Sequence, residues 1–222
     1  MVSLKNTKTE DKRIRGYMKK ILITMLFLAS AKLFAQNITV QINPGEQWNK
    51  RVPQCAIWLE DENNNYIDTI FVTNRASKKN WLFAPKNGRP ESLPVWYGKS
   101  NGNPNIGVSK TFDAVTCATP KKTFFAESKI SLIPEKKYFI KIEVNQSFDY
   151  NEKWTKNNSA PNGQPSLIYQ SSFFGNEKQF INDFILSGIG SVDGKSSDYS
   201  LNDIDYITSA KFIIKSISAE IF

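Results

Sequence analysis

Short hydrophobic runs that alternate with polar residues recur along the chain from residue 38 onward. Residues 140–144 read Ile-Lys-Ile-Glu-Val, so apolar and charged side chains alternate strictly, and residues 216–221 alternate in the same way. Period-two alternation is typical of β-strands, in which successive side chains point to opposite faces. The pattern predicts these strands: Ile38–Ile42, Gln54–Glu60, Tyr66–Thr73, Lys129–Ile133, Tyr138–Val144, Ser166–Ser171 and Phe212–Ile221.

Turn-forming residues separate the predicted strands. The best hairpin signal is Asp61–Asn65, which joins the second strand to the third. Long loops are expected at Pro85–Thr111, Asn145–Pro165 and Ser187–Tyr206. Short helices are expected only at Ala76–Phe83 and Glu177–Ile185. This arrangement predicts an all-β fold, an immunoglobulin-like β-sandwich in which loops carry the function.

The N-terminal part of the chain follows a different pattern. The apolar run Ile21–Ala31 comes directly after two lysines and is followed by another. A basic segment, a short apolar segment and small residues are the parts of a secretory signal peptide, and this run is shorter than the roughly 17–25 residues that span a bilayer. We therefore expect a signal peptide that begins at Met18 and is cleaved after Ala31 or Ala35.

Charge separates the same two parts of the chain. The protein holds 29 basic and 21 acidic residues, a net charge of +8, and eight of the basic and two of the acidic groups lie in residues 1–35. The rest, residues 36–222, is close to neutral and has no electrostatic reason to bind nucleic acid. We expect residues 1–35 to be an N-terminal extension with the signal peptide. Residues 36–222 would form a single domain without a transmembrane segment, exported to the periplasm or cell envelope.

Missing residue types exclude several chemistries. The chain has no histidine, so it cannot form a Ser-His-Asp triad or a histidine-based zinc helix. Its two cysteines, Cys55 and Cys117, are too few for a four-cysteine metal site. Both lie in the exported part, where either a disulfide between them or two separate thiols would be stable. Because the chain has no histidine and no four-cysteine metal site, any redox chemistry would need a bound cofactor.

The most informative segment, residues 113–120, reads Asp-Ala-Val-Thr-Cys-Ala-Thr-Pro. Its small side chains allow another protein to approach closely, and its proline favours an extended backbone at Thr119. The segment resembles the sequence at which ApbE-type FMN transferases attach FMN, through a phosphoester, to the last hydroxyl residue. This resemblance implies that Thr119 carries the FMN. It also implies that Asp113, Thr116 and Ala118 are recognition positions.

A wider resemblance covers most of the exported part. Its most specific segments are Arg89–Trp96, Arg-Pro-Glu-Ser-Leu-Pro-Val-Trp, and Gly163–Tyr169, Gly-Gln-Pro-Ser-Leu-Ile-Tyr. They resemble a family of predicted periplasmic bacterial proteins of unknown function, linked to flavin-based extracytosolic electron transfer beside PepSY-type membrane reductases. The resemblance implies an electron carrier or accessory protein. Trp96 and Tyr97 would then stack on the flavin, with ordinary packing as the alternative. In the FMN-like segment, Cys117 stands where the FMN attachment sequence has glycine.

Two other functions fit the sequence. The protein could be a non-catalytic binding module that recognises a polymer or a protein through its long loops, or a hydrolase that uses Asp149 and Glu152 beside Trp154. The glycine-rich segment Gly188–Gly194 is expected to be a turn, because no βαβ unit surrounds it. A set of aspartates in the C-terminal loop lacks the spacing of a calcium-binding EF-hand. These are Asp193, Asp198, Asp203 and Asp205.

Overall fold

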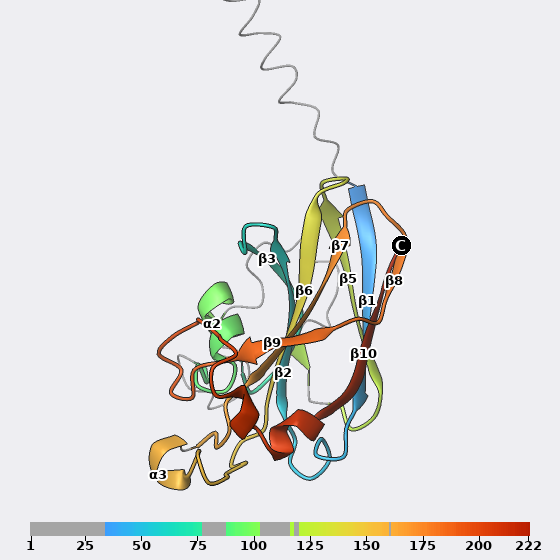
Figure 1. Cartoon of the computed structure of the whole chain (residues 1–222). Helices are drawn as coiled ribbons and strands as arrows, with labels where there is room; N and C mark the ends of the chain where they lie inside the picture. The colour runs from blue at the N-terminus through green and yellow to red at the C-terminus, as the bar shows by residue number, and fades with distance from the viewer. Residues whose placement is uncertain (1–33, 77–87, 103–115, 118–119, 160) are drawn as a thin grey trace, which may run out of the picture. The chain divides into compact units, whose positions relative to one another are not determined.

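The strands of the protein form two β-sheets in its computed structural model, which describes residues 34–76, 88–102, 116–117, 120–159 and 161–222. The four-stranded sheet has the order β5-β1-β10-β8. Its strands are β1 (Phe34–Pro44), β5 (Phe124–Leu132), β8 (Gln179–Ile181) and β10 (Ile214–Ile221). The six-stranded sheet has the order β4-β3-β2-β6-β7-β9, and all of these strands except β4 are labelled in Figure 1. Its strands are β2 (Gln54–Asp61), β3 (Tyr66–Thr73), β4 (Thr116–Cys117), β6 (Lys137–Asn145), β7 (Leu167–Phe174) and β9 (Ile185–Ile189).

One hydrophobic core joins the inner faces of the two sheets. From the four-stranded sheet, β1 buries Ile38, Val40 and Ile42 completely, while the residues between them stay partly exposed. The six-stranded sheet contributes Ile57 and Ile142 to the same cluster. Removing apolar surface from water is worth about 25 cal/mol per Å², so this shared core holds the sheets together. The prediction of an all-β fold with two packed sheets is confirmed.

A second, smaller core covers the outer face of the six-stranded sheet. The helix α2 (Pro94–Ser100) lies beside β3 (Figure 1). Its Trp96 belongs to one buried cluster with Trp58 of β2 and Ile168 of β7. As a result, β2 is buried on both faces from Gln54 to Glu60.

The predicted strands are all present, with ends that differ by a few residues from the prediction. Three strands were not predicted, namely β4, β8 and β9, and each of them lies at the edge of a sheet. These strands contain only two, three and five residues. β4 and β8 are too short to show a period-two pattern, and β9 reads Ile-Leu-Ser-Gly-Ile without alternation, so only their pairing with longer neighbours identifies them.

The predicted helix at Glu177–Ile185 is wrong. Its residues Gln179–Ile181 pair with β10 as the edge strand β8, and its last residue begins β9. The predicted helix at Ala76–Phe83 lies outside the described residues except for its first position. Instead, α2 and the short helix α3 (Lys156–Ser159) lie within segments that were expected to be loops. Pro94 suits the start of α2, because a helix leaves its first amide groups unpaired.

The predicted hairpin between β2 and β3 is confirmed. Asp61 Oδ1 accepts the backbone N–H groups of Asn63 and Asn65, both at 2.9 Å. Asn64 has φ 60°, a left-handed conformation that asparagine tolerates better than most residues. The acidic and amide residues that predicted the turn therefore hold it directly.

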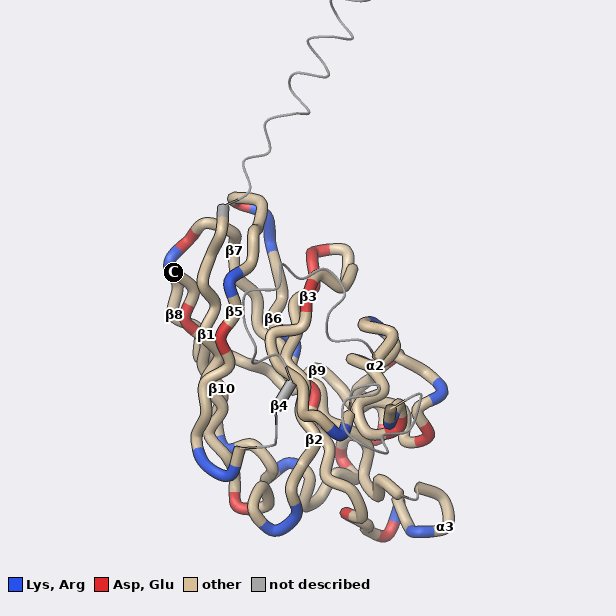
Figure 2. The backbone as a smooth tube through the Cα atoms, turned by 180° about the vertical axis from the view of Figure 1, so that it is seen from behind, with Lys and Arg blue, Asp and Glu red and all other residues tan. Residues whose placement is uncertain are grey.

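Charges of both signs are spread along the described backbone, where basic and acidic positions are interspersed (Figure 2). This distribution agrees with the near-neutral composition of residues 36–222.

Candidate functional site

The described parts of the FMN-like segment, residues 113–120, lie at one edge of the six-stranded sheet. Thr116–Cys117 form β4, which pairs in parallel with Val72 and Thr73 of β3. The carbonyl of Pro120 accepts the indole N–H of Trp48 at 2.6 Å. The backbone is thus anchored on both sides of the predicted attachment position. Three of the predicted site residues lie outside the described residues, namely Asp113, Ala118 and Thr119.

A cavity of about 300 Å³ opens directly beside Pro120. Trp48, Asn49 and Val52 line it together with Pro120 and Lys121. Lys121 and the lysine that follows it are exposed. The surroundings of Pro120 thus combine an open cavity with two cationic side chains.

Cys55 and Cys117 lie on either side of β3. The backbone N–H of Cys55, in β2, donates to Thr73 Oγ1 at 3.2 Å. Cys117, in β4, is the strand partner of Thr73 on the other side of β3. Two strand spacings amount to roughly 10 Å, whereas the Cα atoms of a disulfide are about 4.4–6.8 Å apart. This backbone arrangement does not bring the two cysteines to disulfide distance.

The two aromatic residues predicted to stack on a flavin have different environments. Trp96 is fully buried, and its indole N–H donates to Thr69 Oγ1 at 2.9 Å. Thr69 also exchanges a hydrogen bond with the hydroxyl of Tyr66 at 2.6 Å. Trp96 therefore anchors α2 to β3, and stacking on a flavin would require α2 to move. Tyr97 is half-buried.

A buried carboxylate lies beneath the start of α2. Glu143 of β6 accepts the N–H groups of Val95 at 3.2 Å and Trp96 at 2.8 Å, and the hydroxyl of Ser166 at 2.6 Å. Leu93, at the N-cap position, makes no side-chain cap bond, so Glu143 performs that role from the neighbouring sheet. Burial raises the pKa of Glu143 to about 7, although these three hydrogen bonds act to lower it.

An ion pair is buried on the same face of the sheet. Lys141 of β6 and Glu60 of β2 are each 1% exposed, and Lys141 Nζ lies 3.8 Å from Glu60 Oε2. Lys141 also donates to the hydroxyl of Tyr199 at 2.6 Å and to Gln170 Oε1. Glu60 accepts the indole N–H of Trp58 at 3.0 Å. Buried charges are tolerated when they are paired and hydrogen-bonded, so this cluster fixes the segment around Tyr199 onto the sheet.

The glycine-rich segment Gly188–Gly194 forms close backbone contacts and includes the turn that the sequence predicts. A Cβ at Gly190 would lie 2.5 Å from Ser166 Oγ. A Cβ at Gly194, where φ is 71°, would lie 2.6 Å from the backbone nitrogen of Glu91. These glycines let the segment pack against the residues that precede and support α2.

The two carboxylates of the hydrolase hypothesis have unlike surroundings. The carboxylate of Asp149 accepts hydrogen bonds from Ser209 Oγ at 2.6 Å and Gln164 Nε2 at 2.8 Å. Asp149 thus joins three segments of the chain and is already engaged. Glu152 is exposed to solvent. The structure therefore gives no support to a catalytic pair at these positions.

The aspartates of the C-terminal loop do not gather around a common centre. Among the described residues, no group of three or more metal-ligating side chains is close enough to hold a metal ion. Asp193 instead accepts hydrogen bonds from Ser191 and Lys195, which lower the pKa of its carboxyl group. Asp203 forms an ion pair with Lys153.

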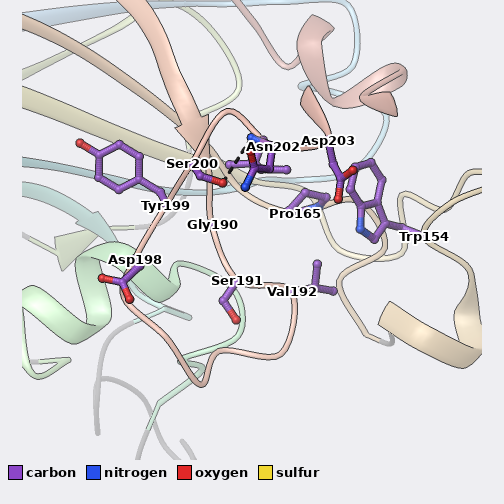
Figure 3. A pocket seen from close by; sticks show the side chains of 11 residues that line it. Trp154, Pro165, Gly190, Ser191, Val192, Asp198, Tyr199, Ser200, Asn202 and Asp203 are labelled. Atoms are coloured by element: carbon purple, nitrogen blue, oxygen red, sulfur yellow. Dashed lines mark hydrogen bonds between the residues drawn. The ribbon is translucent and has the colours of Figure 1, made fainter. Parts of the chain in front are cut away.

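A cavity of about 300 Å³ that the sequence did not predict lies next to Trp154 (Figure 3). Its apolar wall includes Trp154, Pro165 and Val192, and Asp203 lies beside the indole. The sequence grouped Trp154 with the carboxylates nearest to it along the chain. The structure brings Asp203 there from beyond three intervening strands, and no local pattern indicates that contact.

Among the residues that the structure describes, no helix is both long enough and apolar enough to span a bilayer. Comparison with known proteins yielded no matching family model, no matching curated protein and no matching solved structure. The function must therefore be argued from the residues of this chain.

Proposed function

We propose that the protein is an exported carrier of FMN, bound covalently to Thr119, on an immunoglobulin-like β-sandwich of the periplasm or cell envelope. The observation that carries this proposal is the sequence of residues 113–120, Asp-Ala-Val-Thr-Cys-Ala-Thr-Pro. The anchoring of β4 and Pro120 on either side of Thr119 supports it. β4 lies at the edge of its sheet, where a transferase could reach the chain that follows it.

The surroundings of Pro120 suit an anionic group with a planar ring. The exposed Lys121 and Lys122 would attract the phosphate, because Lys acts as a point charge toward phosphate oxygens. The adjacent cavity, with Trp48 in its wall, provides room beside the attachment position. When bound, FMN would supply the electron transfer, and the protein would control its exposure and electrostatic environment.

Two partners follow from this proposal. An FMN transferase of the ApbE type would recognise Asp113, Thr116 and Ala118 and modify Thr119. A PepSY-type membrane reductase would exchange electrons with the carrier. The nearly neutral composition of residues 36–222 gives the exported part no electrostatic reason to bind nucleic acid.

Co-expression of the exported protein with an ApbE-type transferase tests the proposal. The intact mass should increase by one FMN less one water, and the protein band should fluoresce in a denaturing gel. Thr119→Ala should abolish both signals. Thr123→Ala is the matched control, because Thr123 is an exposed hydroxyl residue just beyond the segment and should not affect modification.

Cys117→Gly tests the recognition of the segment separately. Glycine restores the residue that the FMN sequence has at this position and removes the backbone restriction of a Cβ, so the modified fraction should increase. If the wild-type protein and Cys117→Gly both stay unmodified while a known carrier is fully modified in the same cells, the proposed function is wrong.

A further inference from the structure

We propose that the cavity beside Trp154 is a binding site for a neutral sugar, independent of the FMN segment. The cavity lies between the turn that carries Trp154 and the segment that follows β9, and Figure 3 shows its lining residues. Its volume of about 300 Å³ is at the lower end of the range for small-molecule sites, roughly 300–1,000 Å³. It therefore suits one ring rather than a long chain.

One wall of the cavity is apolar and fixed in place. Trp154 is 8% exposed, and Pro165 and Val192 lie near its indole (Figure 3). The N–H groups of Trp154 and Lys153 both donate to Asn151 Oδ1, at 2.9 and 3.0 Å, which fixes the turn beneath the indole. An aromatic wall of this kind packs against the C–H face of a pyranose ring.

Most of the remaining lining is polar. Asp203 lies beside the indole, and Ser191, Ser200 and Asn202 also line the cavity (Figure 3). Carboxylate oxygens only accept hydrogen bonds, whereas hydroxyl and amide groups both donate and accept. The hydroxyl groups around a sugar ring match this set, because each can donate to a carboxylate and accept from an amide.

Asp203 is held in position by Lys153. The two side chains form an ion pair, and Lys153 Nζ also lies 4.0 Å from the centre of the Tyr206 ring. Lys153 itself does not line the cavity, and the lining that the structure describes contains no Lys or Arg. The charged groups in the described lining are the carboxylates of Asp198 and Asp203, and the nearby Lys153 is already paired with Asp203. The electrostatics therefore favour an uncharged ligand over an anion.

Titration of the purified protein with methyl glycosides of glucose, galactose, mannose and N-acetylglucosamine tests the proposal. The readout is the NMR signal of the Trp154 indole N–H, assigned with Trp154→Phe because the chain has five tryptophans. At least one glycoside should shift this signal saturably, with a Kd on the order of 1 mM.

Asp203→Asn should weaken that binding by about tenfold, because a charge-assisted hydrogen bond becomes a neutral one. The variant should fold, since Asp203 has φ 65° and asparagine accepts this conformation well. Asp205→Asn is the matched control, because Asp205 is exposed on the same segment but does not line the cavity. It should leave the affinity unchanged.

Three outcomes would overturn the proposal. The first is that no glycoside shifts the Trp154 signal saturably. The second is that choline or inorganic phosphate binds in place of the glycosides, which would identify a cation or an anion site. The third is that Asp203→Asn and Asp205→Asn weaken glycoside binding equally. None of these outcomes depends on whether Thr119 carries FMN.

Discussion

Glu143 shows how tertiary contacts change the chemistry of a single residue. In the sequence it occupies a polar position of an alternating strand, which predicts a side chain facing solvent. In the structure it is fully buried beneath α2 and accepts the hydrogen bonds that begin that helix. The residue therefore couples its own protonation to the attachment of α2.

We expect the stability of the protein to depend on pH through Glu143. Its pKa is raised from 4.5 to about 7 by burial, so between these values the folded state binds a proton that the unfolded state has lost. The free energy of unfolding should therefore decrease as the pH rises from 4.5 to 7, by about 3 kcal/mol. Glu143→Gln should remove the decrease between pH 6 and 7 and make the decrease below pH 6 less steep, as measured by urea unfolding at a series of pH values.

Asp68 provides the matched comparison. Burial raises the pKa of its carboxyl group from 3.8 to about 6, so its contribution also decreases with rising pH, but over a lower range. Asp68→Asn should make the dependence less steep between pH 3.8 and 6, where Glu143 still contributes above pH 4.5, and should leave the part between pH 6 and 7 unchanged. An unchanged pH dependence in Glu143→Gln would show that the carboxyl group does not titrate in this range.

At the level of elements, α2 is stable because of what surrounds it. A seven-residue helix is too short to be stable alone, so its packing and its cap must hold it. Trp96 anchors it to β3, Glu143 caps its start, and the segment after β9 packs against its side. The contact between Gly98 and Ser197 is part of this packing.

Gly98→Ala should destabilise the protein. The added Cβ would lie 2.3 Å from Ser197 Cβ, so one of the two segments must shift. Overpacking of this kind costs about 1–3 kcal/mol, more than the roughly 1 kcal/mol that alanine gains over glycine within a helix. The melting temperature and the free energy of unfolding should both decrease.

The double variant Gly98→Ala/Ser197→Gly tests the cause of that loss. Removing the Ser197 side chain leaves space for the new methyl group, so the double variant should be more stable than the sum of the single effects predicts. Additive effects of the two substitutions would instead show that Gly98 and Ser197 are not in contact in solution.

At the level of the whole molecule, the central strands of the sheets are more extensively paired and buried than the edge strands. β2 and β6 have a paired strand on each side and are covered on both faces by side chains of the two cores. β4 and β8 are short and pair on one side only among the described residues. Local opening is easiest where few buried contacts must break.

Amide hydrogen exchange should reveal this difference. The backbone amides of Ile57 and Ile142 should exchange among the slowest in the protein, and those of β8 should exchange faster. NMR measurement on the purified protein tests this expectation. Equal protection of β8 and β2 would mean that the edge strands open only when the whole domain unfolds.

Periodicity and residue types by themselves determined the all-β class, the main strands, the hairpin at Asp61 and the absence of imidazole chemistry. These features are local, because the side-chain period of a strand and the composition of a turn are visible within a few residues. Tertiary structure alone decided which faces are covered. It buried Glu143 beneath α2 and Lys141 beside Tyr199, paired the short edge strands and brought Asp203 to Trp154. Contacts of this kind join segments far apart in the chain, and no local pattern records them.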